Sequence, residues 1–138
     1  MNAKHQLVKN WLNKAHRDLL SAKRLASGSD PYLDTAVYHC QQCAEKVVKG
    51  WLIYHDRSFE KTHDLRLLVT LASEIEPAFN EWFDIAEHIA PYATAYRYPG
   101  EILEPDEDEY KEAIKAATDF YGFVCSLLPS ELSATYLP

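Results

Sequence analysis

Apolar side chains recur every three or four positions along most of the chain, which is the spacing of one buried stripe on an α-helix. The first stripe covers residues 8–26, and Gly28 is expected to end that helix. A second stripe covers residues 33–51. The Ser-Asp-Pro segment 29–31 before it is expected to supply a capping oxygen and a first-turn proline. The pattern therefore predicts two long helices at the start of the chain.

Three further stripes follow. Thr62 is expected to cap a short helix over residues 63–75. Pro77 is expected in the first turn of a longer helix that reaches residue 90, where Pro91 should make it kink or restart.

The last stripe begins at Pro105 and Asp106 and ends at Pro129. We find no alternating strand pattern and no internal repeat. The sequence thus predicts an all-α fold, an up-and-down four-helix bundle with an additional short helix. It predicts one domain over residues 1–128 and a C-terminal tail over residues 129–138.

Composition supports a single globular domain. The chain has 138 residues, of which 47% are hydrophobic and 25% charged, and this balance excludes disordered and fibrous classes. No uncharged run is long enough to span a bilayer, and the first residues lack the apolar core of a signal peptide. We therefore expect a cytoplasmic protein that does not enter membranes. Three cysteines, an odd number, argue against a disulfide framework.

The net charge of −7 disfavours a general nucleic-acid coat, because phosphate affinity comes from clustered Lys and Arg. The charge is nevertheless unevenly spread. Residues 1–24 carry six cationic side chains against one carboxylate, Asp18, while residues 101–112 carry seven carboxylates against Lys111. This distribution weakens the argument against nucleic acid, but the favoured interpretation is that the basic stretch is one solvated helix face and the acidic stretch a helix start.

One face of the predicted second helix is wholly polar. At 100° per residue, it gathers the side chains of His39, Gln42, Glu45, Lys46 and Lys49. Either this face is a solvated exterior, or Gln42, Glu45 and Lys46 line a cleft at a subunit interface or around an anionic ligand.

Cys40 and Cys43 have the spacing of a redox or zinc pair, but a metal site needs about four ligands and both sulfurs lie on the apolar stripe. Buried packing is the favoured interpretation for these two cysteines. Cys125 has no base beside it in the sequence. We therefore predict no metal site and no catalytic thiol.

Two residues outside the long helices carry candidate chemistry. His63 either transfers protons near neutral pH or is a capping or core-edge histidine, and Asp64 is placed to neutralise a helix start. Arg97 lies among Tyr92, Tyr96 and Tyr98, the company of an arginine that contacts phosphate or bases. Alternatively, Arg97 pairs with the acidic segment after it.

Three sequence blocks together resemble the HEPN family of prokaryotic helical domains, in order and in spacing, over roughly residues 5–128. The blocks are Tyr38-His39-Cys40-Gln41-Gln42-Cys43-Ala44-Glu45-Lys46-Val47-Val48-Lys49, Thr62-His63-Asp64-Leu65 and Tyr96-Arg97-Tyr98-Pro99. The resemblance implies a dimeric helical bundle that needs no cofactor. It also implies a small nucleotidyltransferase as a partner, often in a toxin–antitoxin pair.

Many members of that family are metal-independent ribonucleases with an Arg-x4–6-His motif that meets its copy across the dimer. Arg97 matches the arginine, but no histidine follows it in this chain. The bare spacing recurs at Arg57 and His63, in the loop after the second predicted helix. The missing histidine predicts a degenerate nuclease motif, whereas nucleotide binding and partner binding do not require it.

The leading hypothesis is a dimeric HEPN-type domain that binds a nucleotidyltransferase-like partner and a nucleotide or RNA. The residues expected at that site are Gln42, Glu45, Lys46, His63, Asp64, Arg97 and Tyr98. The alternative is a metal-independent endoribonuclease, the toxin of such a pair, that uses Arg97 and His63 as catalytic residues. A homodimer is expected in both cases, with Tyr92, Tyr96 and Tyr98 meeting their copies around a shared cleft.

Overall fold

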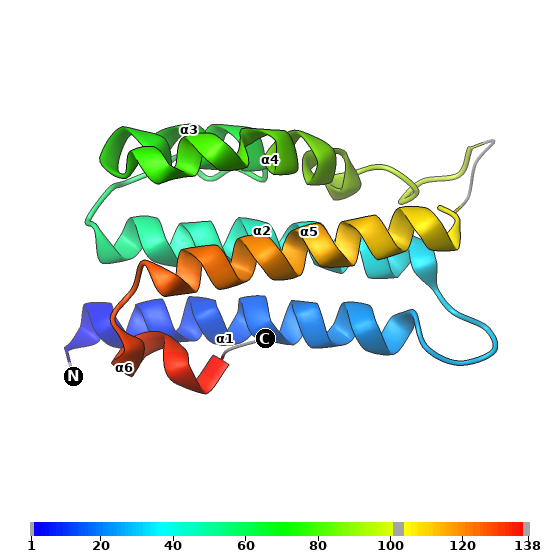
Figure 1. Ribbon diagram of the computed structural model, residues 1–138, viewed down its shortest axis with the longest axis horizontal. Coiled ribbons are helices and arrows are strands. Elements are labelled where there is room, and N and C mark those ends of the chain that lie inside the picture. Colours follow the sequence, from blue (N-terminus) through cyan, green and yellow to red (C-terminus); the bar gives the residue numbers. More distant parts are fainter. Residues whose placement is uncertain (1, 101–103, 137–138) are drawn as a thin grey trace.

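The computed structural model describes residues 2–100 and 104–136. Within them, every regular element is helical, which confirms the predicted all-α fold. Three long helices, α1 (Ala3–Leu25), α2 (Leu33–Tyr54) and α5 (Glu107–Ser126), run side by side along the longest axis (Figure 1). α2 is the central helix, because it packs against α1 and α5 as well as the shorter elements.

The shorter helices lie along one side of this layer. They are α3 (Leu65–Ile75) and α4 (Phe83–Ile89), joined by the 3₁₀ helix η1 (Pro77–Trp82) (Figure 1). The 3₁₀ helix η2 (Ala90–Ala93) follows α4 and packs on α2.

The segment 77–90 differs from the long helix that its periodicity predicts. Its first six residues are 3₁₀, and α4 itself has seven residues. Phe79 is buried in the 3₁₀ part, with its ring centroid 4.8 Å from that of Trp51, so a core contact is made before the α-helix begins. The restart expected at Pro91 is confirmed, because α4 ends at Ile89 and η2 follows directly.

Local capping signals predict some helix starts correctly and others not. Asp106 caps α5, since its Oδ1 accepts from the N–H of Glu109 at 2.8 Å. The expected Thr62 cap is wrong: Asp64 is the N-cap of α3, and the Thr62 hydroxyl accepts from the N–H of Asp64. The expected cap of α2 is also wrong, because α2 starts at Leu33 behind Tyr32 without a side-chain cap.

Part of the predicted tail is folded. Residues 130–136 form α6 (Ser130–Ser133) and the 3₁₀ helix η3 (Ala134–Tyr136), and Leu132 is buried where α6 packs on α1 and α5. Pro129, the sequence signal for the tail, lies between the end of α5 at Ser126 and the start of α6 at Ser130, and the chain after it still packs on the bundle. In the part of the chain that the structure describes, no helix combines the length and apolar character needed to cross a membrane.

Candidate functional site

A surface hollow of about 270 Å³ lies where α2 meets the segment after η2. We call it the His63 hollow; it is lined by Tyr38, Gln42, His63, Ala93, Thr94, Arg97 and Tyr98. Tyr38 and Gln42 are four residues apart and therefore share one face of α2. The fold thus brings four predicted site residues together, from three separate parts of the chain.

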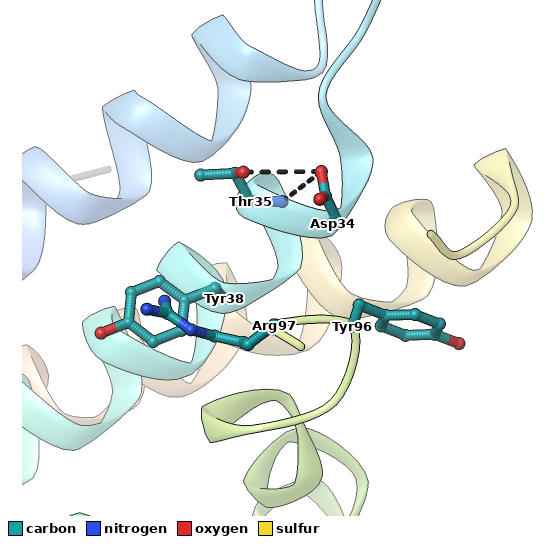
Figure 2. A pocket seen from close by; sticks show the side chains of 5 residues that line it. All are labelled: Asp34, Thr35, Tyr38, Tyr96 and Arg97. Atoms are coloured by element: carbon teal, nitrogen blue, oxygen red, sulfur yellow. Dashed lines mark hydrogen bonds between the residues drawn. The ribbon is translucent and has the colours of Figure 1, made fainter. Parts of the chain in front are cut away.

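Arg97 lies flat against an aromatic ring. Its Cζ is 3.6 Å from the ring centroid of Tyr38, so the guanidinium covers that ring (Figure 2). Among the described residues, no acidic side chain forms an ion pair with Arg97, and the exposed Glu104 is no exception. Glu101, the other expected partner, lies outside the described residues. No carboxylate among the described residues therefore occupies the N–H donors of Arg97.

The segment that carries Arg97 is fixed to α5. The hydroxyl of Tyr92 donates to Glu109 at 2.7 Å, and the hydroxyl of Tyr96 donates to the same carboxylate at 2.9 Å. Tyr96 has a φ of 66°, the left-handed region, and it directly precedes Arg97. Burial, and then the bond to Glu109, raise the pKa of both tyrosines, so both remain donors. Two of the three tyrosines expected to meet a second copy are thus engaged within their own chain.

His63 is held by a buried carboxylate. Its side chain is 71% exposed, yet its Nδ1 lies 3.2 Å from both oxygens of Glu45, whose side chain is 3% exposed. Because a carboxylate only accepts, Nδ1 carries the proton in this contact, and Nε2 is the acceptor of the neutral ring. His63 is therefore not the cap of α3, and Glu45 orients its ring from beneath.

Glu45 is the centre of a buried polar network that the sequence does not reveal. Lys49 Nζ donates to Glu45 at 3.0 Å, and Gln41 Nε2 donates to it at 3.3 Å. Gln42 extends the network, since its Nε2 donates to Gln41 Oε1 at 2.7 Å. The solvated-exterior interpretation is wrong for Glu45 and Lys49. The available signal was the spacing of residues 41, 45 and 49, which places three polar groups within bonding reach.

Two predicted site residues are placed elsewhere. Lys46 faces α1, where its Nζ lies 2.6 Å from Asp18 Oδ2, while His39 Nδ1 lies 2.7 Å from the other oxygen of Asp18. Asp64 caps α3 through the N–H of Arg66. Neither Lys46 nor Asp64 lines the His63 hollow.

Arg57 and His63, which have the bare Arg-x5-His spacing, do not line the same hollow. Arg57 pairs with Glu74 at 3.3 Å and lines a different hollow, beside Ile53 and Phe59. His63 has Arg97, and not Arg57, as the arginine in its hollow.

The cysteines are packing residues, as predicted. Cys40, Cys43 and Cys125 are all buried and free. Burial raises the pKa of Cys40 to about 12 and that of Cys125 to about 11, and raises that of Cys43 as well. These thiols therefore stay protonated near neutral pH and are poor nucleophiles.

Comparison with known proteins supports the resemblance that the three sequence blocks indicate. The HEPN domain model matches residues 8–128. The crystal structure of an archaeal HEPN homologue superposes with a TM-score of 0.68 at 29% sequence identity, covering 87% of this chain and 96% of that one. No curated protein matches the chain. The family match spans most of the chain, and with this structural likeness it shows that the chain belongs to the HEPN domain family.

Proposed function

We propose that this chain forms a homodimer that binds a phosphate-bearing ligand, a nucleotide or RNA, in the His63 hollow. We also propose that it binds a nucleotidyltransferase-like protein. The observation that carries the ligand proposal is the guanidinium of Arg97, stacked on Tyr38 without an acidic partner among residues 2–100 and 104–136.

The chemistry of the hollow favours an anion. A guanidinium that lies flat on a ring keeps its N–H groups at its rim, where they form the two-pronged contact that phosphate oxygens accept. The amide of Gln42 and the hydroxyl of Thr94 line the same hollow and add further donors. Three kinds of donor therefore face one small volume.

Calorimetric titration with ATP, GTP and a short RNA tests this proposal. Arg97→Ala should weaken binding about ten- to hundredfold, the scale of a charged hydrogen bond. It should lower the free energy of unfolding by less than about 1 kcal/mol, since the stack is exposed. Arg97→Lys should recover little, because a point charge lacks the planar fork. Arg57→Ala is the matched control, as it removes an exposed arginine outside the hollow. Equal affinities in all four proteins would contradict the proposal.

The homodimer proposal rests on the family and on the surface around Arg97. Tyr98 is 72% exposed, and it is the tyrosine of this segment without a bond to Glu109 among the described residues. A two-fold contact at Tyr98 would bring two copies of Arg97 near one cleft. Light scattering checks this, because a dimer has twice the chain mass of 15.8 kDa. A monomer at high concentration would contradict it.

The partner proposal rests on the family alone. Co-expression of this chain with a small nucleotidyltransferase encoded beside it should give a complex that survives size exclusion. Separate elution of the two proteins would contradict the proposal.

A second candidate function, metal-independent cleavage of RNA, is favoured by the contact between His63 and Glu45. In this reaction the Nε2 of His63 takes the proton of an RNA 2′-hydroxyl, whose oxygen attacks the adjacent phosphorus. The bond to the 5′-oxygen breaks, that oxygen takes a proton from water, and Arg97 stabilises the charge on the phosphoryl oxygens. The products are a 2′,3′-cyclic phosphate and a free 5′-hydroxyl.

Incubation of RNA with the protein in EDTA tests for those two products. His63→Ala and Arg97→Ala should abolish them, whereas His88→Ala, which removes another exposed histidine, should not. Cleavage that persists in both of the first two variants would come from a contaminant and would refute the candidate reaction.

A further inference from the structure

A second hollow adjoins the His63 hollow and shares Tyr38 and Arg97 with it. We call it the Asp34 hollow; it also measures about 270 Å³ and is lined by Asp34, Thr35, Tyr38, Tyr96 and Arg97. Figure 2 shows the Arg97 side chain extended over Tyr38, with Asp34 and Thr35 one turn earlier on α2 and Tyr96 directed away. Arg97 therefore lies between two hollows, and its guanidinium has N–H groups that can donate into either of them.

The two hollows differ in chemistry. The Asp34 hollow contains a carboxylate, of which Oδ1 accepts from the N–H of Thr35 at 2.8 Å. The other oxygen, Oδ2, has no hydrogen-bond partner among the residues that the structure describes. Among residues 2–100 and 104–136, no carboxylate lines the His63 hollow, whose polar groups are an amide, an imidazole, hydroxyls and the guanidinium.

This difference determines which part of a ligand each hollow can bind. Phosphate oxygens only accept hydrogen bonds and are repelled by a carboxylate, so a phosphate bound to Arg97 belongs on the His63 side. A group that faces Asp34 must instead donate. Hydroxyl groups of a sugar and amino groups of a base are the donors that a nucleotide offers.

The spacing along α2 fits a ligand longer than a phosphate ion. Asp34, Tyr38 and Gln42 follow one another at four-residue steps and so lie along one side of the helix. Two turns separate Asp34 from Gln42, about 12 Å along the axis. A single phosphate cannot contact both ends of this row, but a nucleotide extends from its phosphate through the sugar to the base.

We propose that the ligand of Arg97 spans both hollows, with its phosphate in the His63 hollow and a sugar hydroxyl or base amino group donating to Asp34. Asp34 is then the residue that selects a nucleoside phosphate over phosphate alone. This inference rests on the phosphate site proposed above, and it adds the placement of the ligand and the residue that recognises its nucleoside part.

Binding of inorganic phosphate, ribose 5-phosphate and adenosine 5′-monophosphate to wild type and to Asp34→Asn tests the inference. The variant keeps an oxygen for the N–H of Thr35, so α2 should still begin at the same place. It loses the carboxylate, so the affinity for the nucleotide should fall about tenfold. The affinity for inorganic phosphate should stay the same or rise, because a repelling charge has gone. The ratio of the two affinities is the decisive quantity.

Asp30→Asn is the matched control, because it removes the same charge from an exposed position outside both hollows. Its affinity ratio should equal that of wild type. If ribose 5-phosphate behaves like the nucleotide in Asp34→Asn, the donor is a sugar hydroxyl; if only the nucleotide is affected, the donor is a base amino group. Both results support the inference.

An unchanged affinity ratio in Asp34→Asn, or an equal change in Asp30→Asn, would overturn the inference. If Arg97→Ala still weakens phosphate in that case, the phosphate site stands and only the role of Asp34 is lost. If wild type binds neither phosphate nor nucleotide, or if Arg97→Ala changes nothing, both proposals are overturned together.

Discussion

Replacing Glu45 by glutamine should destabilise this protein strongly, although the two side chains have nearly the same shape. The Glu45 side chain is 3% exposed and that of Lys49 is 8% exposed, and their charged atoms lie 3.0 Å apart. Glutamine removes the only negative charge in this contact. The ammonium group of Lys49 is then left buried beside a neutral amide.

The expected magnitude follows from the partners that remain. A buried charge that loses its counter-ion costs about 3–5 kcal/mol. Lys49 keeps two aromatic neighbours, since its Nζ lies 5.7 Å from the ring centroid of Trp11 and 5.8 Å from that of Phe59. Such contacts offset part of the loss. We therefore expect Glu45→Gln to lower the free energy of unfolding by about 2–4 kcal/mol.

A double-mutant cycle, measured by urea unfolding, gives the interaction energy between Glu45 and Lys49. Lys49→Met fills similar space without a charge, so in the Glu45→Gln background it should remove the unpaired cation and restore stability. The coupling energy of the pair should reach at least about 2 kcal/mol. Lys115 and Asp119 form the matched control, an exposed pair at the same spacing whose Asp119→Asn variant should cost less than about 0.5 kcal/mol.

Two results would refute this reasoning. If Glu45→Gln costs no more than Asp119→Asn, burial does not strengthen the pair. If the two substitutions at Glu45 and Lys49 are additive within about 0.5 kcal/mol, the residues do not interact energetically.

Three further predictions concern the packing. Gly50→Val should cost about 1–3 kcal/mol in urea unfolding, because even a Cβ at Gly50 would lie 3.1 Å from that of Trp11; an unchanged midpoint would mean that α1 and α2 separate freely. Leu132→Ala should cost about 2–4 kcal/mol, since its side chain is buried beneath α6, and a cost near zero would show that α6 contributes nothing. Burial raises the pKa of Cys40 to about 12, above the unfolded value of about 8.5. The protonated thiol therefore stabilises the fold below pH 8.5, and that contribution is lost as pH rises further, by about 1.4 kcal/mol per pH unit. The slope of stability between pH 8.5 and 10.5 should be shallower in Cys40→Ala; an identical slope would contradict the assignment.

The sequence by itself determined the helical class and most element positions. Period-3.6 apolar stripes and the glycine and proline breaks act over a few residues, so they can be interpreted without the fold. Gly28, with a φ of 91°, and the Asp106 cap are examples. The expected cap at Thr62 was wrong because the oxygens of Thr62 and Asp64 compete for the start of α3, and Asp64 caps it. The expected cap in segment 29–31 was wrong because α2 begins only at Leu33, behind Tyr32, and has no side-chain cap.

Four of the residues that the sequence names for the candidate site line one hollow, but the sequence does not show that they meet. Gln42, His63, Arg97 and Tyr98 come from different elements, and only the packing of η2 and the chain before α3 against α2 brings them to one hollow. Stacking of Arg97 on Tyr38 joins residues far apart in the chain, and no local spacing encodes it.

The polar face of α2 shows most clearly what the tertiary structure decided. The sequence establishes which side chains share that face, because helical geometry is local. It does not establish what covers the face, and so it left both a solvated surface and a cleft open. The fold buries Glu45 and Lys49, turns Lys46 toward Asp18 and leaves Gln42 at the hollow. Burial depends on every element that packs against a helix. This is why the side chains of one polar stripe lie in three different environments.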